Sequence, residues 1–246
     1  MKAMILAAGL GTRLRPLTDN TPKALVEIGG YTMLELAVKY LKKHGIDDII
    51  VNVHHLANKI VRYIKANNYF DIKISFSDER CQLLDTGGAI KKASDFLKNE
   101  EPFLLMAVDV LTNLDIKIML EFHKSRNSLV TLAVKKRDTS RSLLFDANMK
   151  LVGWKDNKTK EVKGTYAETA LSALGFSGIH IIEPEIFRQI EEEGAFSVID
   201  LYLRLMEIEP IHGFRHDNDI WLEFGRLERI ETVAKSEEFK KLTNNL

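Results

Sequence analysis

A glycine-rich segment near the N-terminus has residue types that suit phosphate binding. Leu6-Ala7-Ala8-Gly9-Leu10-Gly11-Thr12-Arg13-Leu14 follows a strand-like run, and its small residues let backbone N–H groups approach an anion closely. Two common phosphate-binding patterns are absent: the dinucleotide fingerprint needs a third glycine where Leu14 stands, and the Walker pattern needs a Gly-Lys-Ser/Thr ending. The segment is therefore a candidate anion cradle, and a tight strand-to-helix turn without a ligand is the alternative.

Two basic side chains accompany this segment. Arg13 and Lys23 lie on either side of Pro16-Leu17-Thr18 and Thr21-Pro22, and the two prolines stiffen the stretch. A forked guanidinium and a point ammonium presented in this way can bind a polyphosphate with little ordering cost. The stretch therefore favours triphosphate chemistry over a plain turn.

Two further candidate segments also follow predicted strands. Leu83-Leu84-Asp85-Thr86-Gly87-Gly88-Ala89-Ile90 opens a helix that Thr86 can cap, and the paired glycines permit close backbone approach to a flat ligand. A capped helix start without a ligand is the alternative. Asp109 ends a strand at the edge where ligands bind, so its carboxylate is a candidate Mg²⁺ ligand beside a polyphosphate; a solvated aspartate is the alternative.

The elements that must position these segments follow from the hydrophobic pattern. Short apolar, β-branched runs predict five strands in the first half: Ala3 to Ala7, Ile49 to Val53, Ile72 to Phe76, Phe103 to Val108 and Leu129 to Val134. Amphipathic runs predict helices at Met33 to His44 and Leu56 to Ala66. This alternation predicts a doubly wound α/β sheet, whose ligands bind beyond the carboxyl ends of the strands, at the turns after Ala7, Phe76 and Val108.

The second half is less regular. We expect a hairpin over Leu143 to Trp154 and a strand over Leu174 to Ile182. Helices are expected over Phe187 to Glu193, over Val198 to Met206 and in the polar tail from Lys235 to Leu246.

The composition limits the classes of partner. The 246 residues carry 35 basic and 35 acidic side chains, a formal net charge of +0, so no overall basic field is available to hold nucleic acid or an anionic membrane. The single cysteine, Cys81, cannot form an internal disulfide, and no apolar run approaches the roughly 20 residues of a membrane-spanning helix. A single domain over residues 1–246 in a cytoplasmic protein is the expectation.

The pattern Gly-x-Gly-x-Arg-Leu-x-Pro-Leu-Thr-x-x-x-Pro-Lys, from Gly9 to Lys23, resembles the signature of the nucleoside-diphosphate-sugar pyrophosphorylases. Within that family the chain looks most similar to N-acetylmuramate-1-phosphate uridylyltransferases and to mannose- or heptose-1-phosphate guanylyltransferases. The resemblance implies a Rossmann-like, three-layer α/β/α fold with a mostly parallel mixed sheet. It also implies transfer of a nucleoside monophosphate from a nucleoside triphosphate to a sugar 1-phosphate, with release of pyrophosphate.

The resemblance assigns roles to individual residues. Those implied for nucleotide binding are Ala7, Ala8, Gly9, Gly11, Thr12, Arg13, Gln82 and Gly87, the last two at the base. Arg13, Lys23 and Asp109 would be catalytic, with Mg²⁺ held by Asp109 and Glu223. Those implied for the sugar phosphate are Lys23, Glu168, Ser177 and Gly178.

Several positions depart from the family pattern. Ala107 and Val108 replace the usual Asn-Gly before the aspartate, Glu223 stands where an aspartate is usual, and Leu227 replaces a proline. These changes leave the metal ligands in place but put the geometry at Glu223 in doubt. By resemblance UTP is the first choice of substrate and GTP the second; the sugar and the oligomeric state stay open.

Two other functions compete. A glycosyltransferase of similar α/β fold would use an Asp-x-Asp motif, and Asp109-Val110-Leu111 lacks the second acid. A catalytically impaired, nucleotide-binding regulatory paralogue is suggested by the changed residues near Asp109 and Glu223, whereas Arg13 and Lys23 argue against it. Lys135, at a strand end, is a further candidate phosphate contact, and His54-His55 lacks the partners of a metal site.

Overall fold

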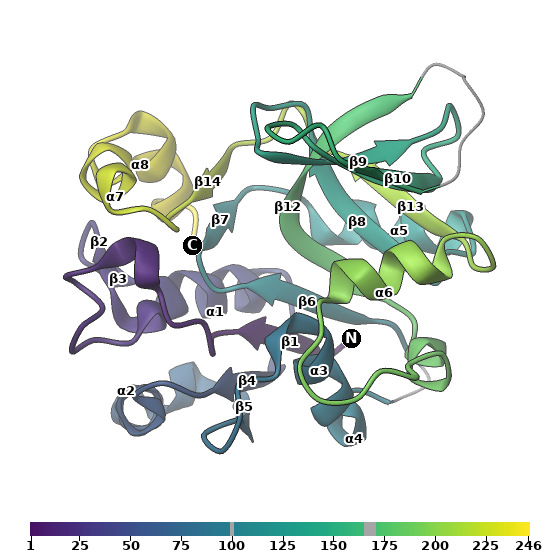
Figure 1. Cartoon of the computed structure of the whole chain (residues 1–246). Coiled ribbons are helices and arrows are strands. Elements are labelled where there is room, and N and C mark those ends of the chain that lie inside the picture. The colour runs from purple at the N-terminus through teal and green to yellow at the C-terminus, as the bar shows by residue number, and fades with distance from the viewer. Residues whose placement is uncertain (99–100, 165–170) are drawn as a thin grey trace.

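The computed structural model describes residues 1–98, 101–164 and 171–246. A ten-stranded mixed sheet forms its centre (Figure 1). Four parallel strands lie in the order β6-β1-β4-β5. Their bounds are β1 (Ala3–Leu6), β4 (Asp48–Val53), β5 (Lys73–Asp78) and β6 (Phe103–Ala107).

The long strand β12 (Ser172–Ile182) joins this parallel part to the rest of the sheet. It runs antiparallel to β6 and to two other strands, β8 and β9, and the remaining strands extend from those. Their bounds are β8 (Val130–Lys135), β13 (Ile211–Arg215), β9 (Arg141–Phe145), β10 (Leu151–Asp156) and β11 (Val162–Lys163). Two small ribbons lie apart, β2 (Glu27–Ile28) with β3 (Tyr31–Thr32) and β7 (Val110–Thr112) with β14 (Trp221–Glu223).

Helices cover both faces of the sheet. Alternate residues of a strand point to opposite faces, so Ile5 packs into one hydrophobic cluster and Met4 into the other. The first cluster includes side chains of α1 (Met33–Lys43), α2 (Ala57–Ala66) and α5 (Ile116–Ser125). The second includes those of α3 (Asp85–Lys92), α4 (Ser94–Leu97) and α6 (Val198–Leu205), which lie in front of the sheet in Figure 1. The predicted fold class, a Rossmann-like three-layer α/β/α arrangement, is confirmed.

Local chemistry explains where the predicted elements begin and end. In α1 the hydroxyl of Thr32 accepts a hydrogen bond from Glu35 N at 3.1 Å, and the chain leaves the helix at Gly45 with φ of +75°. The hairpin predicted over Leu143 to Trp154 is present as β9 and β10. The C-terminal segment forms α7 (Leu227–Ala234) and α8 (Glu237–Thr243), and α8 confirms the helix expected in the tail.

The helix predicted over Phe187 to Glu193 is wrong. A short 3-10 helix, Pro184–Arg188, stands there, and the chain then runs without helix until α6. The acidic residues that follow are tied to different neighbours: Glu192 pairs with Arg204 at 2.8 Å and Glu193 with Lys91 at 2.6 Å. These contacts hold the segment in an irregular conformation that its helical periodicity does not reveal. In the described part of the chain, no helix has both the length and the apolar surface to cross a membrane.

Candidate active site

The glycine-rich turn follows the carboxyl end of β1 and is shaped by residues from other elements. Asn52 Oδ1, on β4, accepts hydrogen bonds from Ala7 N at 2.6 Å and Ala8 N at 3.2 Å. Gly11 has φ of +65°, and a Cβ there would lie 2.8 Å from Thr18 Cγ2, so both conformation and space require glycine. The N–H groups of Ala7 and Ala8 therefore already have a partner, and a hydrogen bond to phosphate stays a prediction for the N–H groups from Gly9 onward.

Lys23 connects this turn with the end of β6. A 3-10 helix, Lys23–Leu25, begins with it, and its Nζ lies 2.6 Å from Asp109 Oδ2. The two side chains are 16% and 10% exposed, so the ion pair is largely shielded from water. Its Coulombic attraction is therefore less screened than that of a surface pair. The stem of Lys23 also lies beside Gly9, because a Cβ on that glycine would be 3.9 Å from Lys23 Cδ. Two residues predicted to be catalytic are thus in direct contact.

Glu223 reaches the same place from β14. Strand β14 pairs with β7 so that Glu223 lies opposite Val110, and Phe224 N donates to Asp109 O at 2.9 Å. The two acids that were predicted as metal ligands, 114 positions apart in the numbering, are therefore brought together by this ribbon.

The carboxylates converge on the space beside Gly225. A Cβ on this glycine would lie 3.0 Å from Asp109 Oδ2 and 3.0 Å from Glu223 Oε1, so those oxygens are no more than 6.0 Å apart. Arg13 Nη2 lies 3.3 Å from the same point. A side chain at this position would crowd all three groups, and they would have to move by a few tenths of an ångström to admit it.

This pair fits a hard divalent cation that also binds phosphate. Mg²⁺ is usually held by one or two carboxylates together with substrate phosphates and water, and oxygens sharing one ion lie about 3 to 4 Å apart. The upper limit of 6.0 Å between Asp109 Oδ2 and Glu223 Oε1 is compatible with that range. Among the residues described, no group of three or more His, Cys, Asp or Glu could hold a metal, so the acids supply at most part of a coordination shell.

A cavity of about 420 Å³ opens beside these groups. Gly9, Lys23, Asn52, Thr86 and Asp109 line it, together with Leu6, Ala8, Leu83, Asp85, Ala107 and Ala195. It therefore joins the turns after β1 and β6 to the start of α3. The three turns predicted to carry the chemistry meet at one edge of the sheet.

Sequence reasoning missed a buried polar link under this cavity. Glu79 is 0% exposed; its Oε1 accepts from Asn52 Nδ2 at 2.8 Å, and its Oε2 accepts from Leu84 N at 3.2 Å. Since Asn52 also holds Ala7 and Ala8, one continuous chain of hydrogen bonds joins the glycine-rich turn to the turn before α3. The available signal was an asparagine inside an otherwise aliphatic strand.

The segment predicted to read the base serves partly for chain packing. The prediction that Thr86 caps its own helix is wrong, because α3 begins at Asp85 and has no side-chain cap. Thr86 Oγ1 instead accepts a hydrogen bond from Val198 N at 2.9 Å, at the start of α6. Gly87 N donates to Phe196 O at 2.8 Å, and a Cβ on Gly87 would lie 2.2 Å from the Phe196 ring. The glycine thus admits a neighbouring chain segment. Gln82 is exposed near the cavity, and its base contact stays a prediction.

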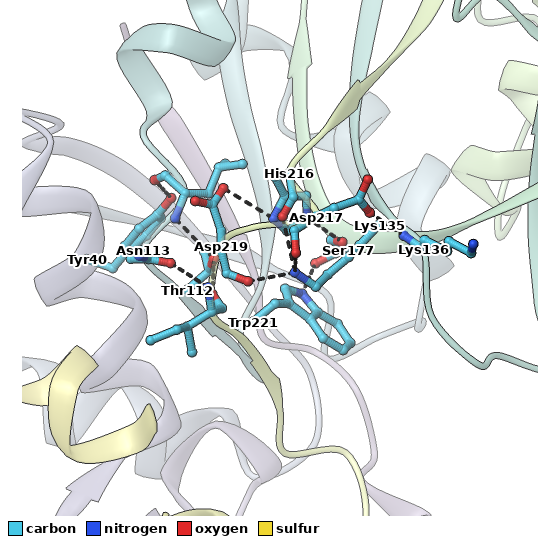
Figure 2. A network of polar contacts seen from close by, with 12 residues as sticks. Tyr40, Thr112, Asn113, Lys135, Lys136, Ser177, His216, Asp217, Asp219 and Trp221 are labelled. Carbon is cyan, nitrogen blue, oxygen red and sulfur yellow. Dashed lines mark hydrogen bonds and ion pairs between the residues drawn. The ribbon is translucent and has the colours of Figure 1, made fainter. Parts of the chain in front are cut away.

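Ser177 and Gly178, predicted to contact the sugar phosphate, lie where the register of β12 against β8 shifts. Ser177 is 0% exposed, its Oγ lies 2.7 Å from His216 Nε2, and its carbonyl accepts from Trp221 Nε1 at 2.9 Å (Figure 2). Gly178 has φ of +78°, and a Cβ there would lie 3.1 Å from Val110 Cγ2. Their contact with a sugar phosphate stays a prediction, and for Ser177 it would require the hydroxyl to leave His216. Glu168 lies outside the described residues.

Lys135 does not point at a phosphate site. Its Nζ donates to the carbonyls of His216, Asp217 and Asp219 at 3.2, 2.6 and 2.6 Å (Figure 2). Burial lowers the pKa of His216 to about 4, with the nearby Lys135 charge acting in the same direction, so this histidine is neutral at pH 7. The network fixes the segment that leads into β14 and thereby the position of Glu223.

Comparison with known proteins gives a consistent result. Residues 2–143 match the family described as Nucleotidyl transferase. The N-acetylmuramate alpha-1-phosphate uridylyltransferase of Neisseria meningitidis serogroup B is 31% identical over 238 residues, covering 94% of this chain and 96% of that protein. The mannose-1-phosphate guanyltransferase of Aspergillus oryzae is 30% identical over 231 residues, covering 92% of this chain. The chain spans 61% of the length of that protein and of some other curated relatives it matches.

A solved structure shares the fold. The inositol-1-phosphate CTP transferase from T. maritima matches with a TM-score of 0.75 at 16% identity, covering 99% of this chain and 95% of that one. The family match, the relatives and the fold agree with the signature from Gly9 to Lys23. The chain therefore belongs to the nucleotidyl transferase family, among the sugar-1-phosphate nucleotidyltransferases.

Proposed function

We propose that this protein transfers the nucleoside monophosphate of a nucleoside triphosphate to a sugar 1-phosphate and releases pyrophosphate. UTP is the first choice of donor. One observation carries this proposal: Arg13, Asp109 and Glu223 converge beside Gly225, and Lys23 pairs with Asp109, with which it lines a cavity at the carboxyl edge of the sheet. Two cations and two acids gathered beside one cavity suit a reaction between two polyanions.

In the proposed reaction an oxygen of the sugar phosphate attacks the α-phosphorus of the triphosphate in line with the leaving group. A new bond forms between that oxygen and the α-phosphorus, and the bond from the α-phosphorus to the α,β-bridging oxygen breaks. The electron pair leaves with pyrophosphate. Because the attacking phosphate is already ionised, no general base is needed, and the protein must align the reactants and neutralise the charge that develops.

The residues divide this task by position. Arg13 and the backbone from Gly9 to Thr12 bind the leaving pyrophosphate, and Lys23 neutralises the reacting phosphates. Asp109 and Glu223 would hold Mg²⁺, which when bound supplies positive charge to phosphate oxygens and orients them. The ion pair with Asp109 holds Lys23 beside the carboxylate that would bind the metal, where its ammonium can also reach a phosphate.

The rival readings differ at identifiable residues. A glycosyltransferase with an Asp-x-Asp motif would need an acid at Leu111, but this residue is fully buried in the first hydrophobic cluster. An impaired regulatory paralogue would bind nucleotide without turning it over. GTP is the alternative donor, because relatives named for uridylyl and for guanylyl transfer both match this chain.

A substrate matrix tests the proposal. The purified protein is incubated with Mg²⁺, each of UTP, GTP, CTP, ATP and dTTP, and each of several sugar 1-phosphates, and pyrophosphate is measured. We expect release that depends on both substrates and is greatest with UTP. Pyrophosphate release with GTP and with no other nucleotide would identify GTP as the donor in place of UTP. Tight nucleotide binding without release in any combination would support the regulatory paralogue.

A further inference from the structure

A second hollow, of about 710 Å³, adjoins the cavity described above. The two share Asp85 and Thr86 in their walls, and the second extends over β10 and α6. Its lining includes two aromatic side chains, Trp154 and Phe176, and three basic ones, Arg137, Arg141 and Lys163. The question is which of these cations is available to a ligand.

Arg137 differs from the other two in its partners. Arg141 has Asp156 at 3.9 Å and Lys163 has Asp200 at 3.9 Å. Among the described residues Arg137 has no carboxylate within ion-pairing distance, and its Nε is buried without a hydrogen-bond acceptor. A guanidinium has five donors and binds anions well, and Arg137 is the cation in this hollow whose charge has no carboxylate partner among the described residues.

The Arg137 side chain is nevertheless held in place. Its guanidinium carbon lies 4.4 Å from the centre of the Trp221 ring, and its Nη2 donates to Phe176 O at 2.8 Å. Gly175 leaves room for it, because a Cβ there would lie 2.8 Å from Arg137 Nε. Stacking, a hydrogen bond and close packing therefore preorganise the group for a ligand.

Arg137 also lies toward the reacting centre. Trp221, on which it stacks, begins β14, and Glu223 ends the same three-residue strand. Burial lowers the pKa of Arg137, and the charge of Glu223 acts on it in the opposite direction, which is consistent with their proximity. The guanidinium thus lines the larger hollow and lies within electrostatic range of Glu223.

We propose that Arg137 binds the phosphate group of the sugar 1-phosphate and positions it for attack, while the sugar ring occupies the hollow beside Trp154. This inference rests on the proposed function, since it assigns a residue to the second substrate of that reaction. A forked guanidinium can hold two phosphate oxygens and leave a third free to attack.

Kinetics with two variants test this role. Arg137→Gln keeps much of the packing but loses the charge, and Arg137→Lys keeps a charge but loses the fork. With the nucleotide saturating, we expect Arg137→Gln to raise the KM for the sugar 1-phosphate about 30-fold or more, Arg137→Lys to raise it less, and the KM for the nucleotide to stay within about twofold. Arg126→Ala is the matched control, because Arg126 also stacks on an aromatic ring, Phe122 at 5.6 Å, and does not line the hollow.

The opposite results are equally clear. An unchanged KM for the sugar phosphate in Arg137→Gln overturns the proposal, and a rise confined to the KM for the nucleotide reassigns Arg137 to the triphosphate. If the wild-type protein shows no turnover in the substrate matrix, the proposed function fails, and Arg137 is tested separately by equilibrium binding of glucose 1-phosphate. Weaker binding by Arg137→Gln than by wild type then supports a phosphate site, whereas equal binding or none rejects it.

Discussion

Asn52 offers the sharpest test of how the framework supports the site. It is 3% exposed and makes three hydrogen bonds, accepting from Ala7 N and Ala8 N and donating to the fully buried Glu79. Asn52→Ala would remove all three and leave two N–H donors and a carboxylate oxygen without their partner. A buried polar group left unpaired costs about 1 to 3 kcal/mol, and entry of water favours the lower part of that range, about 1 to 2 kcal/mol for each of the three groups. The free energy of unfolding should therefore fall by about 3 to 6 kcal/mol.

The loss should be visible in both stability and substrate binding. For a chain of this length it corresponds to a melting temperature about 6 to 24 °C lower. Because Asn52 joins the glycine-rich turn to the turn before α3, the KM for the nucleotide should also rise, while the KM for the sugar phosphate should change less. Urea unfolding at pH 7 and initial rates with each substrate varied in turn measure the two effects.

Two further variants separate the contributions. Asn52→Asp keeps an acceptor for Ala7 and Ala8 but sets a second carboxylate oxygen against Glu79, so it should not restore stability. Asn58→Ala, at an exposed position on α2, should leave stability within about 0.5 kcal/mol. The reasoning is refuted if Asn52→Ala unfolds within about 1 kcal/mol of wild type, or if Asn52→Asp is as stable as the native protein.

Further predictions concern the charged groups and the buried histidines. Lys23→Ala should lower turnover at least about a hundredfold, because a phosphate charge is left uncompensated in the transition state; a folded variant with more than about a tenth of the native rate would remove Lys23 from its role. EDTA should abolish activity, and Asp109→Asn and Glu223→Gln should each reduce it and raise the Mg²⁺ requirement; unchanged rates and metal dependence in both would exclude a shared metal site. Glu223→Asp should also lower activity and need more Mg²⁺, since the shorter side chain withdraws its carboxylate from Asp109; a lower requirement would favour the impaired-paralogue reading. Burial lowers the pKa of His123 and His216 to about 4, whereas an unfolded histidine titrates near 6.5, so the unfolded chain takes up protons first and stability should fall as the pH drops from about 6.5 to about 4. His216→Asn should make the pH dependence of urea unfolding shallower than in the native protein; an unchanged slope would contradict this.

The sequence was most informative where chemistry and local conformation coincide. The turn from Gly9 to Lys23 was predicted because glycines, prolines and basic residues fall within 15 positions, and its conformation does require Gly11. Asp109 could be predicted as a site residue because the end of a parallel strand is a place where ligands bind.

Long-range pairing set the limit of prediction. Asn52 and Glu79 are 27 positions apart and meet only because β4 and β5 are adjacent. The sequence around either residue therefore does not indicate its partner. Gly87 has a local pattern that suits a ligand or a packed chain equally well, and its sequence does not indicate that Phe196 packs against it. The run Lys135-Lys136-Arg137 likewise does not reveal that its members have different roles. Lys135 donates hydrogen bonds to three carbonyls, whereas Arg137 lines the larger hollow.

The proposed transfer of a nucleoside monophosphate to a sugar 1-phosphate is tested most directly by ³¹P NMR of the reaction mixture. Purified protein, Mg²⁺, UTP and the sugar 1-phosphate that gives the highest rate are followed in one tube, with inorganic pyrophosphatase omitted. Our account predicts that the resonances of the triphosphate and the sugar phosphate decline together while those of pyrophosphate and of a sugar-linked diphosphate grow in equal amounts. Conversion of UTP to UMP or UDP with the sugar phosphate unchanged, or persistence of both substrates with every donor and acceptor, would contradict it.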